Sequence, residues 1–377
     1  MRAGIDWCTL PVVAQRAWLA AAALATCGIV GCGSAARSSD GGGDDAASNP
    51  GPDTGLTAEA DAGDDAGGDD TVLTWAQGAP CPQPRFEANG AVIDGELWVM
   101  GGFTASTLQV TRKIDIYDPA TDAWRPGPDL PGAETHIGVA TVGRDIIVVG
   151  GFSGTFSNGP RPPDIADVWR WNAADAAWNP GPPLPGARAA FACALVGNQL
   201  HVAGGLGPDG ASDAPEHFVW DITADPATAA WVTAAPLLDA RNHGGGAALG
   251  GSFYAVAGRH QWNELSGDVS DLNQFDPTSG AWIDLAPIPT ARSEIAASTT
   301  AMSNGRLLVI GGSTAGVTPN SDVLVYDPAQ DTWTALPSLP ERRKGAVAAR
   351  IGRSIIVTTG SPTSVDPSPT TFVGCCL

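Results

Sequence analysis

The sequence predicts an all-β fold, a six-bladed β-propeller with four antiparallel strands in each blade. The 377 residues include 48 glycines and 31 prolines, and the apolar runs are short and bounded by turn residues. Beyond the first thirty residues, no segment has the periodicity of a long amphipathic helix. Tryptophans recur at intervals of 49, 54, 53, 51 and 51 residues, at Trp75, Trp124, Trp178, Trp231, Trp282 and Trp333. Repeats of about fifty residues are typical of propeller blades.

Two further positions recur in register with the tryptophans. A charged residue follows each tryptophan by ten residues, at Arg85, Glu134, Arg188, Arg241, Arg292 and Arg343. Sixteen residues later comes a pair of small residues, at Gly101–Gly102, Gly150–Gly151, Gly204–Gly205, Ala257–Gly258 and, degraded, Thr359–Gly360; Gly311–Gly312 lies nineteen residues on. An aromatic residue also precedes most of the tryptophans by seven residues, at Tyr117, Trp171, Phe275 and Tyr326.

Each landmark has a physical role in a blade. The apolar runs at 95–100 and 145–149 are predicted strands covered on both faces by neighbouring blades. Glycine pairs allow unusual backbone angles and close packing at the end of such a strand. Asp-Pro steps such as Asp118-Pro119 predict tight hairpins leading into the tryptophan strand, and each tryptophan provides an apolar plate between blades.

The order of these landmarks, an apolar run, Gly-Gly, aromatic-Asp-Pro, Trp and Leu-Pro-x-x-Arg, resembles the kelch repeat throughout residues 71–377. This resemblance implies blades arranged around a central channel. Trp75 has no inner strands before it, whereas the last repeat, 343–377, has no tryptophan after it. We therefore predict that residues 72–76 pair with a strand near 370–374 and complete the sixth blade.

The first 32 residues are predicted to be an export signal. Arginines precede the apolar run 17–30, which is short for a membrane span. Ile29-Val30-Gly31-Cys32 resembles a bacterial lipobox, in which Cys32 becomes lipidated, while the segment ending at Cys27 is a weaker candidate. The alternative is ordinary cleavage near Ala35. We expect an outer-membrane or cell-surface lipoprotein that contacts the membrane only through its lipid; otherwise the protein is periplasmic or secreted.

Residues 33–70 are predicted to form a disordered acidic linker, because they contain almost no large apolar side chains. Ten carboxylates between Asp40 and Asp70 supply half of the formal net charge of −20. A charge of this sign argues against a nucleic-acid partner. We expect the propeller itself, 71–377, to be a monomer.

Cysteines are sparse beyond Cys32, and no cofactor is expected. Cys193 is interpreted as a small buried residue of an inner strand. A disulfide between Cys81 and the C-terminal pair Cys375-Cys376 is left open. No spacing of cysteines and histidines resembles a zinc site, so we expect no metal.

The recurring arginines are the first candidate binding residues. At the start of the inner strands they would surround one mouth of the channel, forming a cationic funnel for a carboxylate or sialic-acid-like ligand: Arg85, Arg188, Arg241, Arg292 and Arg343. The competing interpretation is structural, with each arginine bonded to neighbouring backbone.

Two residues further along come Glu87, His136, Ala190, His243, Glu294 and Gly345. The two carboxylates and two histidines are candidate acid–base residues, with Glu87 or Glu294 accepting a sugar hydroxyl proton and a histidine returning it. The alternative is a polar rim without catalysis.

The long loops add Arg161 and a candidate recognition segment containing Arg259, His260 and Trp262. An aromatic residue beside polar groups suits a sugar or peptide surface, although Trp262 would equally serve to cover its blade.

Two families of kelch-type propeller offer comparisons. Galactose oxidase binds copper through tyrosines and histidines, whereas this chain has only three tyrosines, all within repeat strands, which argues against a copper oxidase. The periplasmic sialic acid mutarotases are the better enzyme comparison, since they need no metal. The main hypothesis is a non-catalytic binding propeller at the bacterial cell envelope that recognises a protein or glycan on the channel-mouth face. The alternative is a metal-independent sugar-acid mutarotase or epimerase.

Overall fold

A computed structural model describes residues 73–154, 163–225, 227–261, 267–302, 304–315 and 317–376. Within these residues six four-stranded antiparallel sheets confirm the predicted six blades. The predicted leader with Cys32, the acidic linker, Arg161 and Trp262 lie outside the described residues. No helix in the described part is long and apolar enough to span a bilayer.

Each blade runs from an innermost strand at the channel to an outermost strand at the rim. Blade 1 contains β2 (Asn89–Ile93), β3 (Glu96–Met100), β4 (Ile114–Asp118) and β5 (Ala123–Pro126); blade 2 contains β7 (Gly138–Val142), β8 (Asp145–Val149), β10 (Val168–Asn172) and β11 (Ala177–Pro180). Blade 3 contains β12 (Ala192–Val196), β13 (Gln199–Ala203), β14 (His217–Asp221) and β15 (Val232–Ala234); blade 4 contains β16 (Gly245–Leu249), β17 (Ser252–Arg259), β18 (Asp268–Asp276) and β19 (Ala281–Leu285).

Blade 5 contains β20 (Thr299–Ala301), β21 (Leu307–Ile310), β24 (Val323–Asp327) and β25 (Thr332–Leu336), preceded by the 3-10 helix η1 (Ala296–Ser298). Blade 6 contains β26 (Val347–Ile351), β27 (Ser354–Thr358), β28 (Thr371–Cys376) and, from the other end of the domain, β1 (Leu73–Gly78). Short two-stranded ladders lie in the loops of blades 2 and 5, formed by β6 (Glu134–Thr135) with β9 (Phe152–Ser153) and by β22 (Ser313–Thr314) with β23 (Thr318–Pro319).

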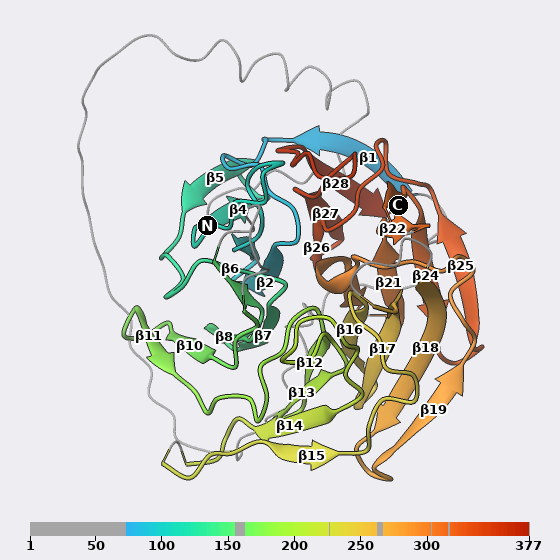
Figure 1. Cartoon of the computed structure of the whole chain (residues 1–377). Coiled ribbons are helices and arrows are strands. Elements are labelled where there is room, and N and C mark those ends of the chain that lie inside the picture. The colour runs from blue at the N-terminus through green and yellow to red at the C-terminus, as the bar shows by residue number, and fades with distance from the viewer. Residues whose placement is uncertain are drawn as a thin grey trace, which may run out of the picture. The chain divides into compact units, whose positions relative to one another are not determined.

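The sixth blade is closed as predicted. Strand β1 pairs with β28 in antiparallel register from Leu73 opposite Cys376 to Gly78 opposite Thr371. In Figure 1 the blue β1 lies against the red β28, so the two ends of the domain share one sheet. This pairing protects an edge that an open ring of blades would leave exposed.

The hydrophobic core lies between blades. Strands β3 and β8 are second from the channel, and their apolar side chains meet across the blade boundary. Met100 of blade 1 and Ile146 of blade 2, for example, are fully buried in one cluster. The continuous apolar runs therefore arise because these strands have a neighbouring blade on each face.

The small-residue pairs connect each blade to the next. The second member of every pair has a φ angle between 77° and 120° and donates its N–H to the carbonyl of the recurring charged residue one blade further on. These six bonds span 2.8–2.9 Å and run Gly102 to Glu134, Gly151 to Arg188, Gly205 to Arg241, Gly258 to Arg292, Gly312 to Arg343 and Gly360 to Arg85. The last bond crosses from blade 6 to blade 1, so these contacts form a closed outer ring of hydrogen bonds. The degraded pair Thr359-Gly360 keeps this geometry.

The repeat tryptophans also join the blades. The indole of Trp333 donates its Nε1–H to the carbonyl of Ala286, four residues after the tryptophan of the preceding blade, at 2.8 Å. The indoles of Trp75, Trp124, Trp231 and Trp282 make the equivalent bond. Within the described residues the buried Nε1 of Trp178 has no partner.

This exception predicts a difference between two matched substitutions. Trp333→Phe removes an inter-blade hydrogen bond and leaves the Ala286 carbonyl without it, which costs about 1 kcal/mol beyond the lost apolar contact. Trp178→Phe removes a buried donor that has no partner among the described residues, so we expect it to cost about 1 kcal/mol less than Trp333→Phe. Urea unfolding of both variants measures the difference, and equal losses would contradict the role of the indole N–H.

The open question about a disulfide has a structural answer for Cys375. Cys81 and Cys375 are both buried. Thr371 lies opposite Gly78 and Cys375 lies opposite Thr74, so Cys81 is beyond the other end of β1. The backbone N–H of Cys81 instead bonds to the carbonyl of Pro369.

Candidate functional site

Six residues around the propeller axis adopt the left-handed backbone conformation at one mouth of the channel. They are the residues two positions after each recurring charge, with φ angles of 52–57°: Glu87, His136, Ala190, His243, Glu294 and Gly345. Each donates its backbone N–H to the carbonyl of the equivalent residue in the preceding blade, over 2.7–3.5 Å, and Glu87 closes the circle by bonding to Gly345. This inner ring of hydrogen bonds turns the chain into the innermost strand of each blade.

The structure brings the four sequence-predicted acid–base side chains together above this ring. His136 Nε2 lies 3.8 Å from Glu87 Oε2, and the His136 and His243 rings meet edge to face with their centroids 4.9 Å apart. Two cations complete the group: Lys344 Nζ lies 2.9 Å from a Glu294 carboxylate oxygen, and Arg259 Nη1 lies 3.6 Å from the other. We call these six residues the axial cluster: Glu87, His136, His243, Arg259, Glu294 and Lys344.

Lys344 was not identified from the sequence. It follows the recurring Arg343 directly, and its equivalents in the other blades are Phe86, Thr135, Ala189, Asn242 and Ser293. The sequence did contain a signal for it, because this position is charged in one repeat and uncharged in the other five. Its side chain is only 6% exposed, and the Glu294 carboxylate is its ion-pair partner.

The hydrogen bonds define the tautomers of both histidines. Arg259 can only donate to His243 Nε2, at 3.2 Å, so the neutral His243 carries its proton on Nδ1 and donates to the amide oxygen of Asn242. The Thr135 hydroxyl donates to the carbonyl of Glu87, which leaves its oxygen to accept from His136 Nδ1–H at 3.1 Å. The unprotonated Nε2 of neutral His136 therefore faces Glu87.

Glu87 is a buried carboxyl that holds its proton more tightly than an exposed one. Burial, followed by the negative charge of Glu294, raises its pKa well above the ordinary value of 4.5, and the charges of Lys344 and Arg259 only partly oppose this shift. The Glu87 carboxyl faces the His136 imidazole, with His136 Nε2 3.8 Å from Glu87 Oε2, and groups of these two types can exchange a proton. The axial cluster can therefore exchange protons and bind polar groups.

The recurring arginines lie inside their own blades, so they do not form the expected cationic funnel. Their exposed fractions are 0–3%. Arg292 illustrates the arrangement, since it donates to the carbonyls of Thr290 and Gly311 and pairs with Asp322 at 3.1 Å. Arg85, Arg188 and Arg241 likewise bond to the first residue of their small pair, and Arg343 bonds to Glu341 and Ser368. The alternative interpretation, that each recurring arginine is structural and bonded to neighbouring backbone, therefore describes these residues. Their guanidinium groups donate hydrogen bonds to buried carbonyls.

The predicted recognition segment divides between two environments. Arg259 belongs to the axial cluster, with its side chain 12% exposed. His260 lies nearer the surface, with Nε2 3.1 Å from Asp239 and Nδ1 3.6 Å from Asp213. Asp213 also accepts from the Asn242 amide, so these loop residues connect to the axial cluster through His243.

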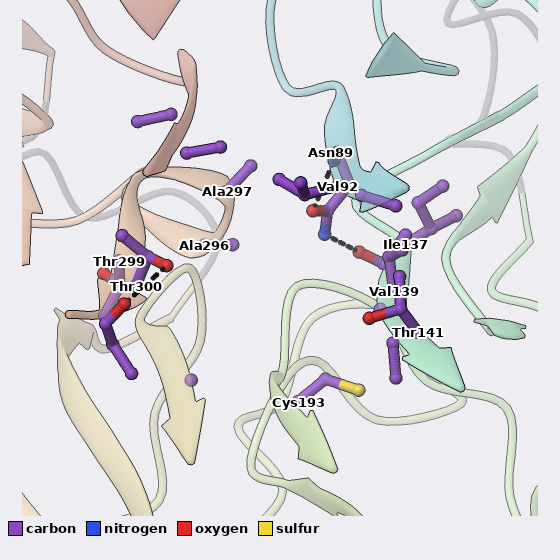
Figure 2. Close-up of a pocket in the computed structure, with 18 of the residues that line it drawn as sticks. Asn89, Val92, Ile137, Val139, Thr141, Cys193, Ala296, Ala297, Thr299 and Thr300 are labelled. Atoms are coloured by element: carbon purple, nitrogen blue, oxygen red, sulfur yellow. Dashed lines mark hydrogen bonds between the residues drawn. The ribbon is translucent and has the colours of Figure 1, made fainter. Parts of the chain in front are cut away.

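A cavity of about 250 Å³ lies in the channel between the innermost strands. Figure 2 shows Val92 and Thr141 on one side of it, Ala297 and Thr300 across from them, and Cys193 below. Cys193, expected to be a small buried residue of an inner strand, lies in β12 and is half-buried, packed against the core at the cavity wall. Burial still raises the pKa of its thiol to about 12, so it is a poor nucleophile.

Within the described residues, no three His, Cys, Asp or Glu side chains are grouped so as to hold a metal ion. The axial cluster pairs its carboxylates with an arginine and a lysine. Such cations compete with a metal for the same oxygens.

Comparison with known proteins identifies the repeat. A model of the kelch motif matches residues 84–131, 135–185 and 296–340. The six-bladed propeller of this chain contains kelch motifs. The matched segments begin near the recurring charge of a blade and extend through its outermost strand.

The chain is similar to kelch-like protein terF of Aspergillus terreus, at 25% identity over 262 residues covering 68% of this chain and 56% of that protein. It is 31% identical to human kelch-like protein 34 over 243 residues, which cover 62% of this chain and 36% of that protein. Among solved structures, YjhT superposes with a TM-score of 0.63 at 16% identity, over 78% of this chain and 96% of that chain. The chain thus spans about half or less of these curated relatives, while the likeness to YjhT concerns the fold.

Proposed function

We propose that this protein is a non-catalytic binding propeller displayed at the bacterial cell envelope, which recognises a protein or glycan on the channel-mouth face. One observation carries the proposal. The scaffold repeats closely, whereas the mouth-face loops between second and third strands differ in length and sequence, from 260–267 in blade 4 to 150–167 in blade 2. Variable loops on a repeated scaffold are the usual place for recognition.

A protein partner is the first expectation. The relatives named above are kelch-like proteins, and kelch propellers generally bind proteins. The recurring arginines are engaged in the fold, so recognition on this face falls to exposed loop residues such as Thr107 and Asp209 around the axial cluster. A glycan is the second expectation. The test below distinguishes it from a protein partner, because proteins and glycans are probed separately.

The test compares the two faces of the propeller by adding one positive charge to each. Thr107→Arg changes an exposed mouth-face loop, and the matched control Ala174→Arg changes an exposed hairpin on the opposite face. Envelope proteins and an immobilised glycan array are probed with the full chain, and the dissociation constant of each captured partner is measured. We expect Thr107→Arg to weaken binding at least tenfold, about 1.4 kcal/mol, and Ala174→Arg to leave it unchanged. Equal effects of both variants would exclude the mouth face.

Export and anchoring are tested separately. We expect a lipid-alkyne label to be incorporated by the wild-type protein and lost in Cys32→Ala, with the propeller remaining folded. A labelled Cys32→Ala protein would place the modification elsewhere.

A mutarotase or epimerase acting on sugar acids is the second candidate, favoured by the buried Glu87 carboxyl beside Nε2 of His136, with the pKa of Glu87 raised above its ordinary value by burial. This pair could transfer a proton to and from a sugar oxygen. Glu87→Gln is expected to abolish such a reaction while the size of the side chain changes little. Thermal shift with sialic acid, uronic acids and neutral sugars gives the binding readout, and no stabilisation specific to the acids would exclude this candidate.

A further inference from the structure

Blade 2 differs from the other blades in the sign of its recurring charge. Glu134 stands where each of the other five has a buried arginine. In blades 1, 3, 4 and 5 the guanidinium donates to the carbonyl of the first residue of the small pair, at Gly101, Gly204, Ala257 and Gly311. In blades 3 and 5 it also pairs with the acid directly before the third strand, Glu216 at 3.0 Å and Asp322 at 3.1 Å. These blades therefore hold a cation among oxygen atoms.

Blade 2 keeps the acceptor groups of this arrangement. The N–H of Gly150, the first residue of its small pair, bonds to the carbonyl of Asp167 at 2.9 Å. The same bond joins Gly311 to Asp322 at 2.8 Å, so Asp167 takes the place of the acid that pairs with the arginine of blade 5. The carbonyl of Gly132 corresponds to those two residues before the arginines of blades 1, 4 and 5, which accept from them: Gln83, Asp239 and Thr290.

The Glu134 side chain brings a further acceptor to this place instead of a donor. The residue is only 3% exposed, and its buried Oε2 has no hydrogen-bond partner among the described residues. Its Oε1 packs against Gly132, where a Cβ would lie 2.6 Å from it. Burial, followed by the negative charge of Asp167, raises the pKa of Glu134 to about 7. A buried carboxylate beside a second one is costly unless a cation compensates them.

We propose that blade 2 binds a calcium ion here, through the carboxylates of Glu134 and Asp167 and the carbonyls of Gly132 and Gly150. Calcium combines carboxylate and backbone carbonyl oxygens in irregular geometry, whereas magnesium demands near-ideal octahedral geometry and keeps several waters. Glutamate is shorter than arginine, which gives the ion the place that a guanidinium takes in the other blades. Asp167 is exposed, so water completes the coordination on that side.

This site differs in kind from the metal sites considered above. Its ligands are two carboxylates and two backbone carbonyls, so it involves neither the cysteine and histidine spacing of zinc sites nor a group of three acidic side chains. Gly150 and Asp167 begin and end the mouth-face loop of blade 2, and Glu134 lies in β6. A bound ion therefore ties both ends of this loop to the entry of the blade, whatever partner the mouth face recognises.

The test follows the full chain after removal of metal ions with EDTA. Isothermal titration and thermal unfolding are measured with calcium, with magnesium, and with sodium chloride at equal ionic strength. We expect one saturable calcium site with a dissociation constant of about 0.1–1 mM, in the range of extracellular calcium modules. About 10 mM calcium should then raise the melting temperature by about 3 °C, and magnesium and sodium should not.

Glu134→Arg restores the charge of the other repeats and gives the sharpest variant. It should raise the melting temperature in EDTA above that of the wild type and remove the response to calcium, because the guanidinium replaces the ion. Glu134→Gln should weaken calcium at least tenfold, because it removes a charged ligand. Asp175→Asn removes an exposed carboxylate from the β10–β11 hairpin on the opposite face of the same blade, and it should leave calcium binding unchanged.

The variants also separate this site from the acidic linker, whose ten carboxylates are a second place for calcium. Calcium stabilisation that persists in both Glu134→Arg and Glu134→Gln overturns the proposal. The proposal is equally overturned if calcium neither binds saturably nor raises the melting temperature of the wild type, or if magnesium has the same effect as calcium.

Discussion

Lowering the pH from 7 to 4.5 is expected to cost about 2–3 kcal/mol of unfolding free energy for each member of a buried histidine pair between blades 3 and 4. His201 on β13 and His217 on β14 are 1% and 0% exposed, and His201 Nδ1 lies 2.9 Å from His217 Nε2. The aromatic rings of Phe253, Phe275 and Trp282 surround them. Aromatic rings solvate a charge poorly, so a proton on either imidazole is disfavoured.

The tautomers of this pair follow from a single carbonyl. The carbonyl of Ala235 lies 3.2 Å from His217 Nδ1 and can only accept, so that nitrogen carries the proton. His217 Nε2 then accepts from His201 Nδ1–H, and His201 Nε2 is left buried without a partner among the described residues. Protonating either ring places a second donor where the described residues offer no acceptor.

Burial accordingly lowers the pKa of His201 from 6.5 to about 3, with a further contribution from His217, and burial lowers the pKa of His217 to about 4. The unfolded chain takes up these protons as the pH falls below about 6.5, but the folded chain does not. The stabilisation is therefore fully present above pH 6.5 and is lost progressively as the pH falls toward 4.

The measurement compares urea unfolding of the wild type and His201→Phe between pH 7 and pH 4.5. We expect the stability difference between them to shift in favour of the variant by about 1.4 kcal/mol per pH unit below 6.5. Phe275→Leu, which alters the same aromatic cluster without removing a histidine, is the control, and its loss of stability should not change with pH. Parallel curves for wild type and His201→Phe would contradict the burial argument.

The second large effect concerns the outer ring of hydrogen bonds. We expect Gly151→Ala to cost about 3 kcal/mol or more. Gly151 has a φ of +107°, and a Cβ there would lie 2.6 Å from both the Thr135 carbonyl oxygen and Ile137 Cγ2. Both atoms belong to the segment that leads into β7, and the Thr135 oxygen is a backbone atom, so the backbone itself would have to shift.

Gly143 of the same blade is the matched control. It also has a positive φ, +59°, but no atom lies within 4 Å of the place a Cβ would take, since Gly143 is in the hairpin between β7 and β8. Gly143→Ala should therefore cost only about 1–2 kcal/mol, the backbone contribution alone. Denaturant midpoints of the two variants test this difference, and equal losses would show that close approach at Gly151 is unimportant.

The parts of the fold that could be predicted are those that depend on the spacing of residues along the chain. The tryptophan spacing predicts six blades, and the missing strands at one end and the missing tryptophan at the other predict the β1–β28 pairing. The small-residue pairs were expected to have unusual backbone angles, but their hydrogen bonds to the next blade could not be inferred. Such a bond depends on how closely two blades approach, and one repeat carries no information about that distance.

The candidate site was predictable only in part. The position that carries Glu87, His136, His243 and Glu294 was identified from repeat register, and the structure brings these residues together. The same reasoning placed the recurring arginines at the channel mouth, where the structure shows them buried and bonded within their blades. A repeated charge looks alike in sequence whether it faces solvent or satisfies buried carbonyls.

By itself, the sequence determined the number of blades, the place of closure and the family resemblance, because each depends on spacing along the chain. Only the tertiary structure decided which charged side chains are buried within the blades, how Lys344 and Arg259 join the axial cluster, and where the cavity lies. These properties arise when six similar repeats meet around one axis. Some of their contacts join different blades, as Lys344 and Glu294 do across fifty positions, and the side chains differ from blade to blade.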